Sequence, residues 1–464
     1  MKHLTCRILL AACIAVVSCI PLRAADAVDM RKRTAELQNL RWGMFICWSF
    51  STFSGKEWTP GVKDLALFKA TACDTDQWAR AAKEAGMGYI QFLTKHHDGF
   101  CLWDTKTTAR KVTKAPLGRD VLAELRKSCD QHGIKLALYF SEGEFGDHQD
   151  YHPGGYTPAM KKAQLQELLT QYGPIEYIWF DTAQGDGGLS HQETLAWCKS
   201  FQPGCFIGFN HGDQSGCDIR IGEMGRPGPL TDATAAGISS GQPADSYLLA
   251  EFTYPILPEH QGGAMWFYSL PQHDRLCRPA AELHADYLGA VKYGNIFSLD
   301  LGPDHRGRLR DIDVETLCQV GELIRNPPPA AANALSRGKK ASASSTWPQA
   351  GYEADKAVDG DTSTRWGAAA EARSAWLEVD FGQPQRVGRA VVSELHYPRT
   401  RRFAVEYLDG QTWQPLAKGT TIAGTNVLDF APVTASQFRL NILEAADVPT
   451  IEEFGLYPPM KAGR

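Results

Sequence analysis

Two carboxylates lie in short apolar runs that a parallel sheet would bring to one edge. Asp181 closes the run 175–181, and Glu251 lies in the run 247–252. Two carboxylates on different strands of one barrel suit glycoside hydrolysis: one attacks the anomeric carbon, and the other protonates the leaving oxygen and then activates water. In retaining enzymes the two groups lie about 5–5.5 Å apart. A lone carboxylate at a strand end is also commonly a helix cap or a salt-bridge partner.

Two adjacent histidines, His96 and His97, follow another apolar run. Side chains alternate along a strand, so one of two neighbouring histidines would point away from the core without a role. Hydrogen bonding to a polyhydroxylated ligand would satisfy both rings. A metal site is the competing interpretation, but no third ligand is evident in the sequence.

Short apolar runs alternate with amphipathic stretches from about residue 40 to 325, which is typical of repeated β–α units. Eight such runs predict an α/β fold, a (β/α)8 TIM-like barrel, with active-site groups at the carboxyl ends of its strands. The predicted strands are 43–48, 87–94, 134–141, 175–181, 205–210, 218–222, 247–252 and 295–301.

Helix signals separate most of these strands. Asp74 predicts an N-cap with Gln77 as its partner in a capping box, and Gly86 predicts the end of that helix. Further helices are expected at 120–132, 158–172, 279–292 and 314–324. The gap between the fifth and sixth strands is too short for a full helix, so the barrel should be irregular there.

The composition changes after residue 325, where three prolines and an Ala-rich stretch predict a stiff linker. Short alternating runs then predict a small antiparallel β-sandwich with strands at 376–381, 389–394, 403–407, 437–442 and 454–457. The predicted organisation is an export segment at 1–27, a catalytic barrel at 28–328, a linker at 329–334 and the sandwich at 335–459.

The first residues predict export. A basic start precedes an apolar run at 8–20 that is too short to span a membrane, and Ala25-Asp26-Ala27 offers a cleavage site. The protein is therefore expected to be secreted or periplasmic. Residues 16–19 also read as a bacterial lipobox, which would leave a lipid anchor on Cys19. No later run is long and apolar enough to predict a transmembrane segment.

Charge and cysteine content exclude several classes of protein. The chain has 464 residues and a net charge of -5, which argues against a nucleic-acid partner. The nine cysteines after the export segment are odd in number and lack C-x-x-C spacing, so neither a disulfide framework nor a zinc motif is indicated.

The barrel region resembles the α-L-fucosidases of glycoside hydrolase family 29. The stretch KHHDGF at 95–100 and the WFD at 179–181 carry the resemblance most specifically. Weaker matches occur in the right order: RWGMFICW at 41–48, KEW at 56–58, LALYFS at 136–141, IGEMG at 221–225, AEF at 250–252, MWFY at 265–268 and LDLGPDHRGRL at 299–309. Those at 221–225, 250–252 and 265–268 resemble the branch acting on α-1,3/1,4-linked fucose.

The resemblance implies a retaining exo-glycosidase that releases α-linked L-fucose from fucosylated glycans and needs no cofactor for catalysis. It makes Asp181 the nucleophile and Glu251 the general acid/base, with Glu223 as the rival for that role. The positions that it implies for substrate binding are Cys47, Trp48, Glu57, Trp58, His96, His97, Tyr139, Trp179, Glu223, Trp266 and Phe267.

One position departs from the family pattern. The family's opening strand reads FIHWG, and its His holds a sugar hydroxyl, whereas this sequence has Cys47. A thiol is a weak donor, and a site loses discrimination when a donor to a hydroxyl is lost. Two alternatives to a fucosidase therefore stay open: a retaining glycosidase for another, galactose-configured sugar, and a non-catalytic glycan-binding protein.

The C-terminal region resembles discoidin, or factor 5/8 type C, domains and family 32 carbohydrate-binding modules. AVDGD at 357–361 with TRW at 364–366, then WLEVDFG at 376–382, carry that resemblance. Such modules commonly hold a structural calcium ion. The matching oxygen donors are Asp359, Asp361, Thr364 and Glu453, which suit a hard cation; a turn rich in Asp and Gly that holds no ion is the alternative.

Overall fold

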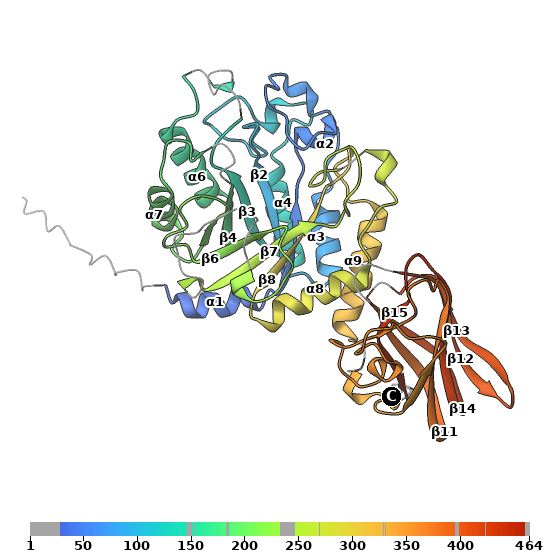
Figure 1. Ribbon diagram of the computed structural model, residues 1–464. Helices are drawn as coiled ribbons and strands as arrows, with labels where there is room; N and C mark the ends of the chain where they lie inside the picture. Colours follow the sequence, from blue (N-terminus) through green and yellow to red (C-terminus); the bar gives the residue numbers. More distant parts are fainter. Residues whose placement is uncertain are drawn as a thin grey trace, which may run out of the picture.

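The computed structural model describes residues 28–459 apart from 146–150, 153, 182–184, 233–245, 269, 328, 330, 395–398 and 423. It contains an α/β barrel and, beside it, an antiparallel β domain (Figure 1). The predicted export segment 1–27, with Cys19, lies outside the described residues. In the ranges given, none of the helices combines the length and the apolar character needed to cross a bilayer.

Eight parallel strands form the barrel, as predicted. They follow one another in the order β5-β4-β3-β2-β1-β8-β7-β6, so β5 and β6 are the two ends of the hydrogen-bonded path. The strands are β1 Trp42–Ile46, β2 Tyr89–Lys95, β3 Lys135–Ser141, β4 Tyr177–Asp181, β5 Phe206–Phe209, β6 Ile219–Glu223, β7 Leu249–Pro255 and β8 Ile296–Leu301.

The barrel is nearly closed between β5 and β6, where the irregularity was expected. Residues 210–218 form turns and bends instead of a crossover helix. Two contacts join the ends: the Asp218 amide donates to the Ile207 carbonyl at 3.1 Å, and the Ile207 amide donates to Asp218 Oδ2 at 3.1 Å. The Lys199 ammonium pairs with the same carboxylate at 2.5 Å. We call this junction the seam.

Helices surround the barrel (Figure 1). Asp74 caps α3, because its Oδ1 accepts from the Gln77 amide at 3.0 Å. The expectation that the Gln77 side chain completes a capping box with Asp74 is wrong. That side chain instead donates to the Leu309 carbonyl and accepts from the Leu309 amide. The helices are α1 Met30–Gln38, α2 Phe50–Ser54, α3 Thr75–Glu84, α4 Val121–His132, α6 Pro158–Gln171, α7 His191–Phe201, α8 Ala280–Lys292 and α9 Asp311–Arg325.

A polar layer lies inside the barrel. The Tyr89 and Tyr177 hydroxyls meet the Ser298 hydroxyl at 2.8 and 3.0 Å, and Tyr177 donates to Gln91 Oε1 at 2.6 Å. Gly43 makes room for the Tyr89 ring, because a Cβ there would lie 2.4 Å from it. All of these side chains are buried, so each hydroxyl depends on the others for its hydrogen bonds.

The C-terminal domain is a seven-stranded antiparallel structure around its own apolar core. Its strands are β9 Lys340–Ala343, β10 Trp366–Gly367, β11 Ala375–Glu394, β12 Thr400–Asp409, β13 Thr412–Gly419, β14 Thr425–Ala445 and β15 Thr450–Tyr457. The predicted strands at 376–381 and 389–394 are one strand, β11, because the Gly-Gln-Pro at 382–384 is absorbed as a register shift. Strands β9, β10 and β13 were not predicted.

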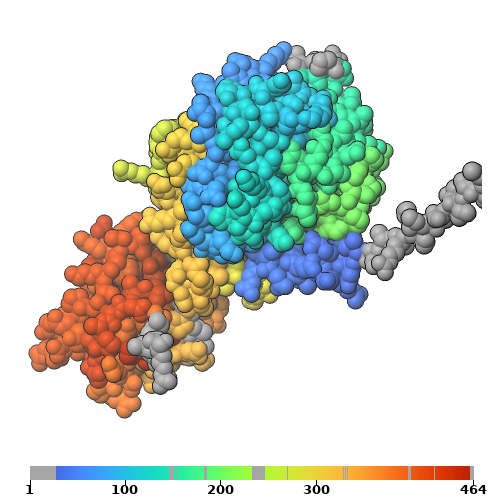
Figure 2. Space-filling view, turned by 180° about the vertical axis from the view of Figure 1, so that it is seen from behind, coloured from blue at the N-terminus to red at the C-terminus, as the bar shows by residue number. Residues whose placement is uncertain are grey.

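The two domains touch each other (Figure 2). At the start of β14, a Cβ on Gly424 would lie 3.1 Å from the Ala281 side chain on α8. The chain between α9 and β9 includes the short 3-10 turn Ala331–Asn333, which falls within the predicted linker.

Candidate active site

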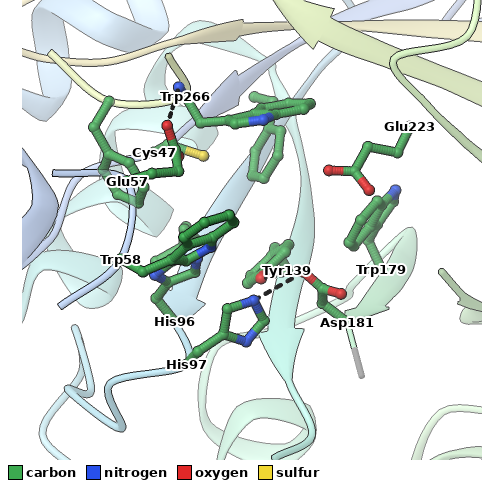
Figure 3. A pocket seen from close by; sticks show the side chains of 13 residues that line it. Cys47, Glu57, Trp58, His96, His97, Tyr139, Trp179, Asp181, Glu223 and Trp266 are labelled. Carbon is green, nitrogen blue, oxygen red and sulfur yellow. Dashed lines mark hydrogen bonds and ion pairs between the residues drawn. The ribbon is translucent and has the colours of Figure 1, made fainter. Parts of the chain in front are cut away.

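A cavity of about 470 Å³ opens at the carboxyl ends of the barrel strands. It brings together most of the side chains that the sequence singled out (Figure 3). Its walls are Phe45, Cys47, Glu57, Trp58, Leu93, His96, His97, Tyr139, Trp179, Asp181, Glu223, Trp266 and Phe267.

Asp181 ends β4 and is held on one oxygen. Its Oδ2 accepts from the Tyr139 hydroxyl at 2.7 Å and lies 3.3 Å from His97 Nε2. Its Oδ1 has no hydrogen-bond partner among the described residues; His211 Nε2 lies 3.7 Å away. Burial would raise the pKa of Asp181, but the hydrogen bond and charge of His97, with the Tyr139 hydroxyl, lower it to about 2. Asp181 is therefore ionised at neutral pH, and its Oδ1 accepts no hydrogen bond from the described residues.

Glu223 ends β6 and faces the same cavity (Figure 3). Burial and the nearby negative charge of Asp181 raise its pKa to about 7, against the opposing effect of Asn210. The Asn210 amide donates to Glu223 Oε2 at 2.7 Å and thereby fixes the carboxyl in place. Two carboxyl groups whose surroundings push their pKa values apart are the pattern of an acid and a nucleophile.

Glu251 does not reach the cavity. Strand β7 was predicted to end at residue 252 but continues to Pro255, so Glu251 lies deeper in the barrel, level with Ile221 and two residues below the layer of Glu223. It is fully buried; its Oε2 accepts from Trp179 Nε1 at 3.2 Å, and its Oε1 has no hydrogen-bond partner among the described residues. Burial raises its pKa to about 8, so the carboxyl is neutral in the folded protein.

The two histidines differ in their surroundings. Burial and the neighbouring His97 hold the pKa of His96 well below its usual value, so His96 is neutral. His96 Nδ1 is buried with no hydrogen-bond partner in the described structure. His97 contacts Asp181 and Ser141 instead. No group of three or more His, Cys, Asp or Glu side chains in the described ranges is placed to hold a metal ion.

Glu57 connects two walls of the cavity. Its Oε2 accepts from the Met265 amide at 2.6 Å and the Trp266 amide at 3.4 Å. This contact positions the Trp266 ring, which packs against Phe45 at 6.1 Å between ring centroids. Trp58 is 56% exposed while lining the cavity, which places it at the mouth.

The side chains of Cys47 and Trp48, just after β1, point in different directions. Cys47 lines the cavity, and its thiol interacts electrostatically with the buried carboxyl of Asp300 on β8. Burial raises the pKa of both groups well above their usual values. Trp48 was expected to bind substrate, but alternation points it the other way. It is fully buried, donates to the Asp304 carbonyl at 3.0 Å and packs on Phe68.

Two buried ionic clusters hold the segment that follows β3. Glu144 accepts from Lys95 at 3.2 Å and pairs with His152 at 2.9 Å. Glu142 accepts from Lys161 at 2.5 Å and pairs with His191 at 2.9 Å. Each carboxylate therefore has a cation in contact, as a buried charge requires.

Four residues with a role at the site were not found from the sequence: Ser141, Asn210, His211 and Asp300. Asn210 and His211 directly follow the fifth strand, so the rule that found His96 and His97 could also have found them. Ser141 ends β3 within a stretch already compared with the family. Asp300 also lies in a compared stretch, 299–309, but an acidic residue in an apolar strand becomes meaningful only beside Cys47.

The calcium donors predicted in the C-terminal domain gather around one turn. Asp359 Oδ2 accepts from the Thr364 hydroxyl at 2.8 Å, and Glu453 Oε2 accepts from the Gly360 amide at 3.2 Å. Glu453 Oε1 is buried with no hydrogen-bond partner in the described residues. Burial and the charge of Asp359 raise the pKa of Glu453 to about 8.

This donor set fits a hard cation. The carbonyls of Lys356 and Asp361 lie 3.1 and 2.9 Å from the Thr364 hydroxyl. The Asp361 side chain instead accepts from the Ser363 amide and hydroxyl. Carboxylate, hydroxyl and carbonyl oxygens are the ligands that Ca²⁺ prefers. Asp361 would therefore contribute its carbonyl, and an ion would use the free oxygen of Glu453.

Family models match both domains. The model described as Alpha-L-fucosidase matches residues 63–326, more than half of the chain, and the F5/8 type C domain matches residues 340–454.

Relatives match over nearly the whole chain. "Alpha-L-fucosidase 1" of Arabidopsis thaliana is 27% identical over 90% of this chain and 86% of its own length. Among solved structures, a glycoside hydrolase 29 family member from an unknown rumen bacterium has a TM-score of 0.52 at 23% identity, covering 93% of this chain and 77% of its own. A Ruminococcus gnavus GH29 fucosidase mutant in complex with fucose has a TM-score of 0.50 at 20% identity, covering 93% and 94%. At these identities the two structures establish the shared fold.

Proposed function

Because the chain belongs to the α-L-fucosidase family, we propose that it is a retaining exo-glycosidase that releases α-1,3- or α-1,4-linked L-fucose from glycans. One observation carries the mechanism: Asp181 and Glu223 line one cavity with pKa values of about 2 and about 7. The first is a carboxylate and the second a carboxylic acid near neutral pH, as a nucleophile and a general acid must be.

In the first step Asp181 Oδ1 attacks the anomeric carbon, since Oδ2 is occupied by Tyr139 and His97. The glycosidic bond breaks, and Glu223 gives its proton to the departing oxygen. In the second step the Glu223 carboxylate takes a proton from water, whose oxygen attacks the same carbon from the vacated side. The bond to Asp181 then breaks, and the anomeric configuration is retained.

The role of general acid/base is assigned here to Glu223 and not to Glu251. A group that protonates the leaving oxygen must come within hydrogen-bond reach of it. Glu251 is fully buried and bonded to Trp179, below the layer that forms the cavity.

The rest of the cavity suits a deoxy sugar. His96 and Glu57 offer polar atoms to ring hydroxyls, and Trp266 and Phe267 form an apolar wall against which the C5-methyl group of fucose could pack. The solved R. gnavus relative is named as a complex with fucose, which supports the same glycone here.

A galactose-configured glycone is the second candidate, and the pair Cys47–Asp300 favours it. The cavity has a thiol, beside the carboxyl of Asp300, where the family has a sugar-binding His. The opposed pKa values of Asp181 and Glu223 argue against a non-catalytic binding protein, since binding alone needs neither group.

In the C-terminal domain we propose a structural calcium ion held by Asp359, Thr364, Glu453 and the carbonyls of Lys356 and Asp361. The ion would stabilise the turn and supply no chemistry to the barrel. Export to the periplasm or outside the cell, with or without a lipid on Cys19, is also proposed from residues 1–27.

The test is a screen of purified protein on aryl glycosides and fucosylated oligosaccharides. Hydrolysis of α-L-fucosides, with the α-anomer of fucose as the first product by ¹H NMR, is the expected result. A first product of inverted configuration would overturn the retaining mechanism. Activity confined to galactosides would transfer the proposal to the second candidate, and inactivity on the whole panel would refute both.

A further inference from the structure

His97 lies at the centre of a chain of contacts that ends at a backbone carbonyl. Its Nε2 is 3.3 Å from Asp181 Oδ2, and its Nδ1 is 2.6 Å from the Ser141 hydroxyl. The same hydroxyl is 2.6 Å from the Gly143 carbonyl oxygen. Figure 3 shows the His97 ring turned towards Asp181.

The hydrogen atoms in this chain can be counted. A carbonyl oxygen only accepts, so the hydrogen between Ser141 and Gly143 must come from the Ser141 hydroxyl, which has only one. Ser141 must then accept from His97, and His97 Nδ1 carries a hydrogen. Neutral imidazole has one N–H, so a neutral His97 would turn the lone pair of Nε2 towards the Asp181 carboxylate.

We propose that Ser141 is a positioning residue that fixes the hydrogen of His97 on Nδ1, so that His97 can hold Asp181 only as an imidazolium. This inference rests on the proposed role of Asp181. The two histidines therefore differ: His96 is neutral and free for sugar hydroxyls, whereas both ring nitrogens of His97 are engaged by Ser141 and Asp181.

The charges around His97 favour the cation. Asp181 on β4 contacts it, and Glu223 on β6 and Asp98 on its own segment interact with it electrostatically. His96, the other titratable ring in contact, is neutral. From the segment after β3, Phe145 presents an uncharged ring, and the nearby Glu142 and Glu144 are paired with Lys161 and Lys95.

A cation at this place has a defined effect on the reaction. It stabilises the Asp181 carboxylate before attack and again when the carboxylate departs in the second step. The segment that supplies the Gly143 carbonyl is held by the two buried ionic clusters, so the orientation of Ser141 is fixed before substrate binds.

The test is the tautomer of His97, read by ¹H–¹⁵N NMR of the full chain labelled with ¹⁵N-histidine. Loss of a signal in His97→Gln assigns the ring. In the unmodified protein we expect the neutral ring to carry its hydrogen on Nδ1. Neutral His97 in the Nε2–H form would overturn the proposal.

Substitution of Ser141 gives the second measurement. In Ser141→Ala the constraint is gone, so the neutral ring should switch to the Nε2–H form and donate to Asp181 without a charge. Thr94→Val is the matched control, because Thr94 also donates a buried hydroxyl to a backbone carbonyl nearby, that of Tyr139 at 2.6 Å. The control should keep the Nδ1–H form. An unchanged tautomer in Ser141→Ala would also overturn the proposal.

The measurement does not depend on turnover, so inactivity on α-L-fucosides would refute the proposed function and leave this result intact. Should Ser141→Ala fail to fold, the tautomer in the unmodified protein still decides. Asp181→Asn adds an independent reading: its amide can donate to Nε2, so His97 should become neutral and remain in the Nδ1–H form.

Discussion

Trp179 Nε1 donates to Glu251 Oε2 at 3.2 Å, which connects a wall of the cavity to the polar layer inside the barrel. The Trp179 ring also stacks on Tyr139, with 5.2 Å between ring centroids, and Tyr139 donates to Asp181. Two aromatic side chains thus connect Glu251 to Asp181, and Glu251 itself lies below the cavity.

Glu223→Gln and Glu251→Gln should therefore differ sharply. Glu223→Gln should lower kcat/KM by about 10²–10⁴-fold on substrates with poor leaving groups and much less on activated aryl glycosides. Glu251→Gln keeps an acceptor for Trp179, so its loss should stay within the tenfold expected of one hydrogen bond, about 0.5–1.5 kcal/mol. Kinetics on a matched pair of aryl leaving groups decides. A leaving-group dependence in Glu251→Gln alone would return the role of acid to Glu251.

The pH dependence of kcat/KM should follow the two carboxyl groups of the cavity. Activity requires ionised Asp181, whose pKa is about 2, and protonated Glu223, whose pKa is about 7. Activity should therefore fall as pH rises past about 7 and be insensitive to Asp181 down to strongly acid pH. With an activated substrate in Glu223→Gln, the fall near pH 7 should disappear. If the fall persists, a group other than Glu223 causes the loss of activity above pH 7.

Asp181→Ala should abolish turnover without loss of the fold. The expected decrease in kcat is on the order of 10⁴-fold or more, because no other group can form the covalent intermediate. Azide should partly restore cleavage of an activated α-L-fucoside and give a product of inverted configuration. Circular dichroism checks the fold. Activity close to that of the unmodified protein would remove Asp181 from the mechanism.

Cys47→His tests the departure from the family pattern. If the thiol limits recognition of the glycone, the imidazole should raise kcat/KM for an aryl α-L-fucoside by up to about tenfold, the value of one hydrogen bond. Cys47→Ser is the control, since it keeps the size and a donor beside Asp300. Cys47 is 2% exposed, so the larger ring must fit in a packed wall. A joint loss of fucosidase activity and thermal midpoint would contradict the hypothesis.

Calcium should stabilise the C-terminal domain more at high pH. Without the ion, Glu453 is neutral in the fold up to its pKa of about 8, whereas in the unfolded chain it ionises near its ordinary value of 4.5. Stability without calcium should thus fall as pH rises between these values, and calcium should reverse the fall. At 100 times its Kd the ion should add about 2.7 kcal/mol. Differential scanning calorimetry with calcium or EDTA measures this, and an Asp359→Ala variant should show no response.

The sequence predicted the barrel well, because buried parallel strands are read from apolar runs without any knowledge of their partners. The prediction from the sequence failed where a residue's position along its strand decides whether its side chain reaches the cavity. Tyr254 and Pro255 extend β7 past the predicted end, so Glu251 is placed one layer too deep to reach the cavity. In the C-terminal domain, two separate strands were predicted at 376–381 and 389–394, but a shift in register lets β11 continue through both ranges. Such outcomes depend on pairing between strands, which one strand does not encode.

The seam has a consequence for how the enzyme can change over time. Glu223 lies on β6, which ends the hydrogen-bonded path, whereas Asp181 lies on β4, which is paired on both sides. Amide hydrogens along β6 should therefore exchange with solvent faster than those of β4. Insertions and substitutions near the acid disturb fewer ladder bonds than those near the nucleophile. Strand pairing thus constrains the proposed leaving-group side of the reaction less than the proposed attacking side.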